Sequence, residues 1–478
     1  MHWPAALMSL PGSEAVVLVA ALTLGTVACA KALRRASSVT YLRGVILREG
    51  ASRRRRGVRM KRSSAVALTL AGIPVPTADE TKHFKLIGTT GTGKSTAIRE
   101  LMAGALARGD RAVFADPDGG YQARFFNRYR GDIVLNPFEP DSVKWDVLSE
   151  INNTYDVEQL ASGLIPSSDD ASASEWRSYA RTFLCAVVRR CREKSRLDCG
   201  ELWRLLAVAP SEELRPVVAG TPAQPFLDPE NARMFGSIRS VAVSAMSAFE
   251  HVQAQRATPF SVRRWVKGRT APGILFIPYK AAHISALRSM IATWMRIAIF
   301  EAMNGAENSD QRLWFVIDEL DALGAIDGLK DALARLRKFG GRCVLGFQSV
   351  AQVSSTYGAG AAQTIIENCG NTLILRCSAS ESGGTSQFAS RLIGDREILR
   401  RQVSRGSDRE ALFSARGSRR STSASEQHVT EAAVMASQIE QLADLSGYFK
   451  GASSGAWLRV SFGPHGRGRN PLLRPGME

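Results

Sequence analysis

The segment Gly88-Thr89-Thr90-Gly91-Thr92-Gly93-Lys94-Ser95 constrains the fold of this chain more than any other. It matches the phosphate-loop pattern of Gly, four residues, Gly, Lys and Ser or Thr. Consecutive backbone N–H groups in such a turn, followed by a helix N-terminus, form a concave site for phosphate. The flanking sequence fits, because residues 83–87 resemble a short buried strand and residues 96–108 have helical apolar spacing. We therefore expect an α/β nucleotide-binding domain; the alternative is a surface loop that matches by chance.

The same loop predicts which residues bind a nucleoside triphosphate. In this pattern Lys94 reaches the β and γ phosphates, and the Ser95 hydroxyl is a ligand of Mg²⁺. We expect ATP and Mg²⁺ as cofactors and no other metal, because the seven cysteines lack the paired spacing of a zinc site. The predicted cofactor-binding residues are Gly88, Thr89, Thr90, Gly91, Thr92, Gly93, Lys94, Ser95 and Thr96.

Two further strand-like runs end in polar residues. Residues 313–317 are apolar and lead into Asp318 and Glu319, which is typical of a Walker B strand. Asp318 is then the ligand of Mg²⁺ and its water, and Glu319 orients or deprotonates the attacking water, unless the two acids simply begin a helix. Residues 342–347 lead into Gln348, at the edge where α/β folds place their chemistry. The Gln348 amide either contacts the γ-phosphate or caps the next helix.

The order of these patterns predicts an interrupted domain. Strand-like runs occur at residues 83–87 and 111–115 and resume at residues 273–278. Between them, residues 144–265 show helical periodicity with few strand-like runs, most clearly at 175–192 and 201–207. We therefore expect a helical insertion between the two halves of one α/β domain.

The net charge of +17 is not in itself a sign of nucleic-acid binding, because three short segments account for it. Residues 31–62 contain twelve Lys and Arg against one Glu, and residues 401–420 and 466–478 supply the remaining excess. The rest of the chain is formally neutral. Residues 404–428, rich in Ser, Arg and Gly, are interpreted as a mobile hairpin or linker.

The largest basic segment directly follows sixteen apolar residues, 15–30. This stretch is slightly short for a membrane span, but the dense positive charge after it favours a transmembrane helix with the remainder in the cytoplasm. The alternatives are a signal peptide, although residues 1–14 contain no Lys or Arg, and a lipoprotein-type Cys29. The basic segment would contact anionic lipid head groups, or else DNA.

Several segments resemble the type IV coupling protein family of conjugation and type IV secretion systems (TraD/TrwB-like). The resemblance covers about residues 40–460. Besides the phosphate loop and the Walker B run, it is carried by residues 41–44 (YLRG), 83–87 (HFKLI), 113–119 (VFADPDG), 133–138 (IVLNPF), 337–349 (RKFGGRCVLGFQS) and 444–450 (DLSGYFK).

The resemblance implies a RecA-like P-loop NTPase domain with an inserted all-α domain, preceded by an N-terminal transmembrane helix. It implies a homohexamer at the cell inner membrane, with most of the chain in the cytoplasm. The implied activity is that of a DNA-dependent ATPase that links the relaxase-bound plasmid DNA, the relaxosome, to the type IV secretion channel and pumps single-stranded DNA during conjugation.

The resemblance also assigns roles by matching position. It implies that Lys94 and Ser95 bind nucleotide and Mg²⁺, that Asp318 and Glu319 are the catalytic acids, and that Gln348 senses the γ-phosphate. Arg337 matches an arginine that completes the site of the neighbouring subunit; otherwise it is a surface charge on a helix. An arginine supplied in this way stabilises charge on the transferring phosphoryl group.

The predicted domains are a membrane anchor (1–40), the two parts of the RecA-like domain (41–143 and 266–460), the all-α insertion (144–265) and a flexible tail (461–478). Two features depart from the family: one convincing apolar segment instead of two, and no long acidic tail. Two other functions stay open. One is another RecA-like translocase, for chromosome partitioning or protein secretion, and the other is a nucleotide-binding docking hub without motor activity.

Overall fold

The computed structural model describes residues 39–50, 68–167, 170–193, 198–268, 273–308, 311–380, 383–407 and 420–463. The chain divides into two compact units, one formed by Met1–Ile46 and Ser390–Met435, the other by Leu47–Ala389 and Ala436–Glu478. The apolar stretch 15–30 lies outside the described residues. Within the described ranges, no helix combines the length and the apolar character that a membrane span needs.

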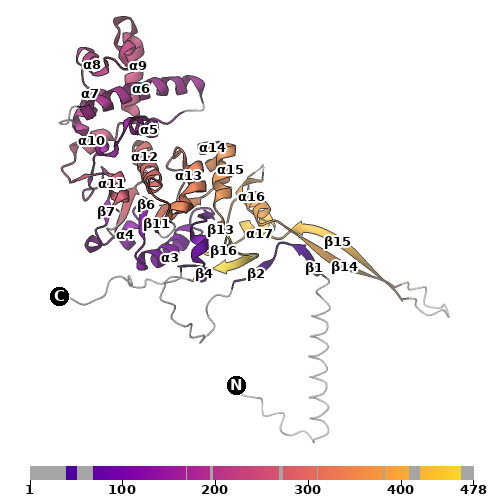
Figure 1. Cartoon of the computed structure of the whole chain (residues 1–478). Helices are drawn as coiled ribbons and strands as arrows, with labels where there is room; N and C mark the ends of the chain where they lie inside the picture. The colour runs from indigo at the N-terminus through magenta and orange to yellow at the C-terminus, as the bar shows by residue number, and fades with distance from the viewer. Residues whose placement is uncertain are drawn as a thin grey trace, which may run out of the picture. The chain divides into compact units, whose positions relative to one another are not determined.

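A ten-stranded sheet forms the centre of the second unit (Figure 1). Neighbouring strands run parallel from β13 to β7, and β16 pairs antiparallel with both β13 and β17. In spatial order the strands are β2 (Leu47–Glu49), β17 (Trp457–Ser461), β16 (Ser446–Lys450), β13 (Asn371–Ile374), β5 (Phe84–Ile87), β12 (Gly341–Phe347), β11 (Leu313–Ile317), β6 (Arg111–Pro117), β10 (Ile274–Tyr279) and β7 (Ile133–Val134).

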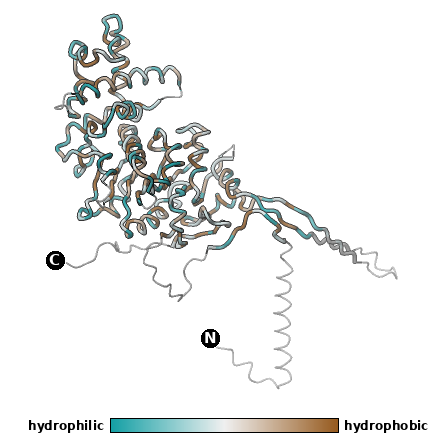
Figure 2. Tube along the Cα trace, in the orientation of Figure 1, coloured by the Kyte–Doolittle hydropathy of each residue, from teal (hydrophilic) through white to brown (hydrophobic). Residues whose placement is uncertain are grey.

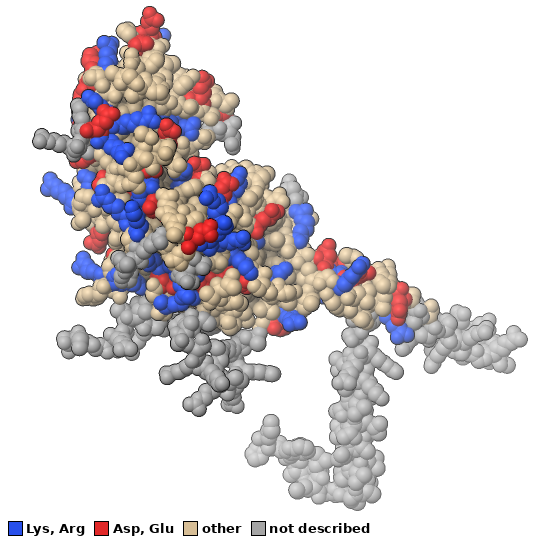
Figure 3. Space-filling view, in the orientation of Figure 1, with Lys and Arg blue, Asp and Glu red and all other residues tan. Residues whose placement is uncertain are grey.

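The central strands are mostly apolar and buried because helices cover both faces of the sheet. On one face, Trp314 and Val316 of β11 share a buried core with α3 (Lys94–Ala107). On the other, α12 (Ile284–Ala302) and α13 (Leu329–Leu336) pack against β11 and β12. Figure 2 shows the resulting concentration of hydrophobic residues along these strands. Charged residues of both signs are instead interspersed over the visible surface (Figure 3).

In the sequence, a group of helices separates the strands of the large sheet that end with β7 from those that begin with β10. The chain enters it after β8 (Lys144–Trp145) and leaves it at β9 (Pro259–Phe260), and these two short strands pair in parallel. The helices expected at residues 175–192 and 201–207 are parts of α6 and α7. The helices are α5 (Thr154–Leu164), α6 (Ala171–Glu193), α7 (Cys199–Ala207), α8 (Ser211–Val218), α9 (Ala232–Ala245) and α10 (Phe249–Ala254); α11 (Val262–Lys267) follows β9.

The first unit contains a three-stranded antiparallel sheet of β1 (Val39–Gly44), β14 (Asp395–Ser407) and β15 (Arg420–Ala432). The described parts of the segment interpreted as a hairpin or linker, 404–407 and 420–428, belong to β14 and β15, which pair as a hairpin. The α-helices and strands not yet named belong to the second unit, except that α16 continues into the first: β3 (Leu68–Leu70), β4 (Ile73–Val75), α2 (Thr77–Glu80), α4 (Gln122–Phe125), α14 (Val350–Tyr357), α15 (Ala359–Asn368), α16 (Gly384–Ile393) and α17 (Ala436–Glu440).

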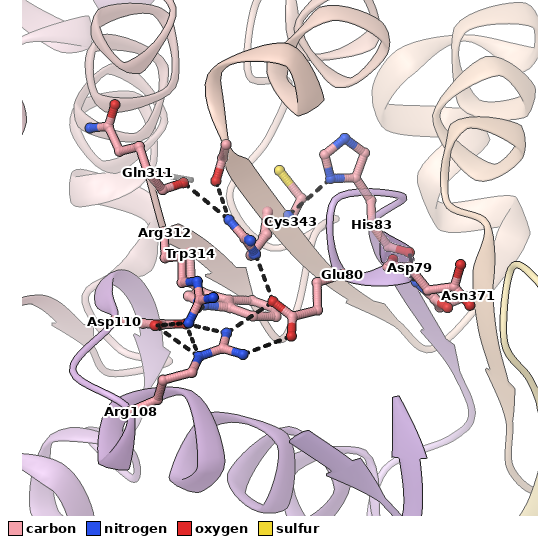
Figure 4. Close-up of polar contacts among 12 residues, drawn as sticks. Asp79, Glu80, His83, Arg108, Asp110, Gln311, Arg312, Trp314, Cys343 and Asn371 are labelled. Atoms are coloured by element: carbon pink, nitrogen blue, oxygen red, sulfur yellow. Dashed lines mark hydrogen bonds and ion pairs between the residues drawn. The ribbon is translucent and has the colours of Figure 1, made fainter. Parts of the chain in front are cut away.

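A buried network of charged side chains closes the amino edge of the large sheet (Figure 4). Arg108, directly after α3, forms ion pairs with Glu80 (2.8 Å) and Asp110 (2.5 Å). Arg342 of β12 binds the same Glu80 carboxylate through Nε at 3.0 Å, and the indole N–H of Trp314 donates to Asp110 at 2.8 Å. Because each carboxylate bonds more than one donor, the network ties α2 and α3 to the starts of β11 and β12.

His83 lies at the same edge, immediately before β5. Its backbone has a positive φ of 55°, and its ring is 1% exposed. Nδ1 accepts a hydrogen bond from the Cys343 backbone N–H at 3.1 Å, so Nε2 carries the proton and donates to the Leu333 carbonyl at 2.9 Å. Burial, together with the nearby positive charges of Arg337 and Arg342, lowers the pKa of His83 to about 4, although the hydrogen bond to Leu333 opposes this change. The neutral ring thus joins β5, β12 and α13.

Candidate active site

The phosphate-loop segment connects β5 to α3 at the carboxyl edge of the sheet. Gly91 and Gly93 adopt positive φ values of 78° and 115°, in the region that favours glycine. A side chain at Gly93 would also lie 2.8 Å from a methyl group of Leu445. The Leu445 backbone N–H donates to the Thr92 carbonyl at 2.9 Å, so a segment near the C-terminus packs directly on the loop.

Lys94 is held inside the loop. Its ammonium group donates to the carbonyl oxygens of Gly88 (2.6 Å) and Thr89 (3.2 Å), and the residue is 6% exposed. Burial lowers the pKa of Lys94, while the negative charges of Asp318 and Glu319 oppose this change. A positive charge is therefore held against the backbone of a glycine-rich turn that leads into the N-terminus of α3, which is the kind of arrangement that binds phosphate.

Asp318 follows β11 and receives two hydroxyl groups on one carboxylate oxygen. Ser95 Oγ donates to Oδ2 at 2.6 Å, and the Tyr121 hydroxyl donates to the same atom at 2.8 Å. The other oxygen, Oδ1, is buried and has no hydrogen-bond partner among the described residues. Hard oxygen ligands of this kind suit Mg²⁺, so Ser95 and Asp318 are the residues that fit a magnesium ion with its bound water.

Glu319 and Gln348 lie side by side because β11 and β12 are neighbouring parallel strands. The Gln348 amide N–H donates to Glu319 at 3.3 Å, and its carbonyl oxygen accepts from the Thr90 hydroxyl at 2.9 Å. Burial raises the pKa of Glu319, and the negative charges of Asp318 and Asp321 raise it further. A raised pKa makes this carboxylate a better proton acceptor for a nearby water.

These side chains surround a cavity of about 190 Å³ at the carboxyl edge of the sheet. The structure thus brings together the phosphate loop, both acids and Gln348, although they come from segments more than two hundred residues apart. The lining residues are Thr90, Gly91, Gly93, Lys94, Ser95, Thr96, Asp318, Glu319, Gln348 and Leu445.

Arg337 is not part of this arrangement within one chain. It is exposed in the short 3-10 helix Arg337–Phe339, which precedes β12 at the amino edge of the sheet. Gln348 follows the opposite end of β12, a strand that extends about 20 Å at 3.3 Å per residue. The role implied for Arg337 therefore stays a prediction about a neighbouring subunit.

Three residues at the site were not predicted to belong to it. Tyr121 bonds Asp318, and Leu445 lines the cavity. Asp116, at the end of β6, is fully buried and accepts the backbone N–H groups of Tyr121 (3.0 Å) and Gln122 (2.7 Å). Burial raises the pKa of Asp116 to about 6. The signal for Tyr121 was its position just after a strand next to β11, because the carboxyl ends of parallel strands meet at one edge.

The comparison with known proteins agrees with this geometry. The sequence profile described as the type IV secretion-system coupling protein DNA-binding domain matches residues 67–462. Coupling protein TraD of Escherichia coli (strain K12) is 29% identical over 390 residues, which are 80% of this chain and 52% of TraD. A conjugal transfer protein TraG of Escherichia coli is 23% identical over 382 residues, 71% of this chain and 59% of TraG. The chain thus spans little more than half the length of these curated relatives.

The solved structures give the same result. Bacterial conjugative coupling protein TrwBdeltaN70 is 30% identical with a TM-score of 0.75, over 88% of this chain and 93% of that chain. TrwB has also been solved with a non-hydrolysable ATP analogue and with ADP and Mg²⁺. The mixed α/β fold with its large parallel sheet is therefore the fold of TrwB, and the sequence resemblance is confirmed. The chain belongs to the family of type IV secretion-system coupling proteins.

Proposed function

We propose that the chain is a DNA-dependent ATPase of the coupling-protein type. It links relaxase-bound plasmid DNA to a type IV secretion channel and pumps single-stranded DNA during conjugation. One observation carries the enzymatic part of this proposal: Lys94, Ser95, Asp318, Glu319 and Gln348 line a single cavity. The nucleotide complexes of TrwB support ATP and Mg²⁺ as the cofactors of this cavity.

The proposal assigns each side chain a role during hydrolysis. Lys94 and the loop amides bind the phosphate oxygens and offset their negative charge. Ser95 and Asp318 would hold Mg²⁺, which when bound would supply positive charge to offset the negative charge of the phosphates. Glu319 accepts a proton from the attacking water. Gln348, fixed between Thr90 and Glu319, orients that water and contacts the γ-phosphate.

The site of a single chain is incomplete on this proposal. Arg337 is exposed and lies at the far end of β12 from Gln348, so it is free to enter the site of another copy. An arginine supplied by a neighbour would stabilise the charge on the transferring phosphoryl group and make hydrolysis depend on assembly. This supports a ring of identical subunits, for which a homohexamer is the proposed state.

The domain organisation is part of the same proposal. Residues 41–143 and 266–460 form the two parts of a RecA-like motor, and residues 144–265 form the all-α insertion. The parallel pairing of β8 with β9 at the root of the helices supports an insertion. Residues 1–40, with the apolar stretch 15–30, anchor the chain in the inner membrane, and residues 461–478 form a tail.

The decisive experiment measures ATP hydrolysis by the purified full-length hexamer with and without single-stranded DNA. We expect DNA to stimulate turnover in the wild type and Lys94→Thr to abolish it. Lys330→Thr is the matched control, because Lys330 is an exposed lysine on α13 away from the cavity. Turnover that DNA fails to stimulate would contradict the motor assignment. Lys94→Thr that left plasmid transfer intact would favour a docking hub instead.

A further inference from the structure

The end of α4 and the loop that joins it to β7 (Figure 1) expose an unusual combination of side chains. Tyr129 is 100% exposed, the highest value among the exposed large hydrophobic residues. Arg124, in the last turn of α4, and Arg128, directly before Tyr129, are also exposed. Among the described residues, neither guanidinium group has an ion-pair partner. We call these three residues the Arg–Tyr loop.

The backbone under the Arg–Tyr loop is rigidly braced. The Asp132 carboxylate is fully buried and accepts hydrogen bonds from the backbone N–H groups of Asn127 (2.8 Å) and of Ile274, the first residue of β10 (3.0 Å). Arg130 forms a two-point pair with the same carboxylate, at 2.8 and 2.6 Å. Asn127 in turn accepts the backbone N–H of Tyr129 at 2.9 Å. One arginine of the segment is thus used to build the loop.

The two arginines and the ring that are left over have no structural task in the described part of the chain. Proteins bind single strands by combining exposed aromatic rings, on which bases stack, with cations that pair with the phosphates, and Tyr129 with the two unpaired arginines close to it in the sequence supplies both kinds of group. A braced loop also loses little conformational freedom on binding. We propose that the Arg–Tyr loop is a contact for single-stranded DNA, an inference that rests on the DNA-translocating function proposed above.

The test measures binding of a fluorescent oligothymidylate to the full-length protein at several salt concentrations. Tyr129→Ala should weaken binding at least about fivefold, since base–aromatic stacking is worth 1 kcal/mol or more. Arg124→Ala and Arg128→Ala should each lower the slope of log affinity against log salt by about 0.7, the value for one phosphate contact on a single strand. DNA-stimulated hydrolysis should fall in step, while basal hydrolysis stays unchanged.

Two matched controls carry the same substitutions elsewhere. Tyr155→Ala removes a tyrosine that is 66% exposed on α5, and Arg215→Ala removes an exposed arginine on α8. Both should bind DNA like the wild type. Wild-type binding with no loss in the three loop variants would overturn this inference and leave the proposed function standing. A wild type that does not bind would refute the proposed function itself. Loop variants that lose only self-association would make the loop a contact between copies of the chain, which also overturns the inference.

A second, independent observation concerns Tyr121. Its ring is 1% exposed, stacks on Phe114 with 5.2 Å between centroids, and lies 5.6 Å from the Arg99 guanidinium carbon. Its backbone N–H is bound by Asp116, so a buried carboxylate at the end of β6 fixes the turn that carries the ring. The Tyr121 hydroxyl therefore reaches Asp318 from a rigid position.

We infer that Tyr121 is a positioning residue for the magnesium ligand Asp318, again on the basis of the proposed ATPase. Ser95 and Tyr121 share the carboxylate oxygen Oδ2, which leaves Oδ1 as the buried oxygen without a partner. Since Ser95 is itself a predicted metal ligand, Tyr121 is the donor that holds the carboxylate plane independently of the metal. Without it, the carboxylate can rotate away from the geometry that Mg²⁺ requires.

Tyr121→Phe removes this donor and keeps the ring packing. We expect the ratio of ADP affinities measured with Mg²⁺ and with EDTA to fall about tenfold, the effect of losing a hydrogen bond to a charged group. ADP affinity in EDTA should stay at the wild-type value. The control is Tyr448→Phe, because Tyr448 is a buried tyrosine on β16 outside the site. This substitution should leave both affinities unchanged.

The outcomes separate a positioning role from a general structural one. A variant that loses ADP affinity equally with and without Mg²⁺ would show that Tyr121 only maintains the fold, and an unchanged ratio would show that Asp318 does not need it. Either result overturns the inference. Wild-type protein that binds ADP with Mg²⁺ but never hydrolyses ATP would instead count against the proposed ATPase.

Discussion

Replacing His83 by Gln should remove a specific acid sensitivity from the folded protein. The neutral ring bonds Leu333 and Cys343, and burial lowers its pKa to about 4, against 6.5 for an unperturbed histidine. The pKa of His83 is lower in the folded chain than in the unfolded chain. Above pH 6.5 the residue is mostly neutral in both states, so its titration does not lower the stability there. As the pH falls toward 4, the unfolded chain takes up a proton here that the folded chain does not, and stability decreases.

The size of the effect follows from the two pKa values. Between pH 7.5 and 5.0, the free energy of unfolding should fall by about 2 kcal/mol on account of His83 alone, and by about 3 kcal/mol once the pH is below 4. Gln keeps a donor within reach of the Leu333 carbonyl and does not titrate in this range. The variant should therefore show a weaker pH dependence even if its stability at pH 7.5 is lower.

Urea unfolding followed by circular dichroism at pH 5.0 and 7.5 measures this difference. The decrease in the free energy of unfolding on acidification is measured for the wild type and for His83→Gln, and the second decrease is subtracted from the first. This subtraction cancels the contribution of every other titrating group. His251→Gln, at an exposed histidine on α10, is the control and should behave like the wild type. A double difference below about 0.5 kcal/mol would refute the argument that the buried neutral ring is the cause.

Three further predictions concern the site and its support. Glu319→Gln should lower ATP turnover by about 10²-fold or more while nucleotide affinity changes little, and unchanged turnover would refute the general-base role. Gly346→Ala should destabilise the fold by about 1–3 kcal/mol in urea unfolding, because its Cβ would lie 2.3 Å from the Asp318 carbonyl oxygen; Gly360→Ala, with open space around it on α15, should not. Arg108→Met should lower the free energy of unfolding by about 3–5 kcal/mol, because it removes a positive charge that pairs with the buried carboxylates of Glu80 and Asp110. A decrease below about 1 kcal/mol would contradict this role for the network.

The parts of the fold that local sequence patterns could predict are those with continuous apolar runs. The strands β5, β6, β10, β11 and β12 are buried on both faces, so their hydrophobicity is visible without knowledge of their neighbours. Their parallel arrangement then places every carboxyl end at one edge. For this reason the cavity could be predicted from strings more than two hundred residues apart.

The remaining features depend on contacts that no local pattern records. Strand β2 is only three residues long and pairs with β17. Leu47 is therefore paired with Trp457, although almost the whole sequence separates the two residues. The bond from Tyr121 to Asp318 depends on a turn fixed by Asp116, and the sequence shows only that a tyrosine follows the strand. The His83 ring bonds two segments some 250 residues away, which the residues next to it in the sequence do not reveal.

Because Leu445 packs on the phosphate loop, hydrogen exchange at its backbone amide should depend on whether nucleotide is bound. Leu445 adopts a positive φ of 59°, donates its N–H to the Thr92 carbonyl at 2.9 Å and accepts the N–H of Phe462 at 2.7 Å. Two main-chain hydrogen bonds in series therefore join the nucleotide cavity to the end of β17. If nucleotide stiffens the loop, the Leu445 amide should exchange its hydrogen more slowly, so that occupancy becomes measurable in unlabelled protein from a residue that does not itself bind phosphate.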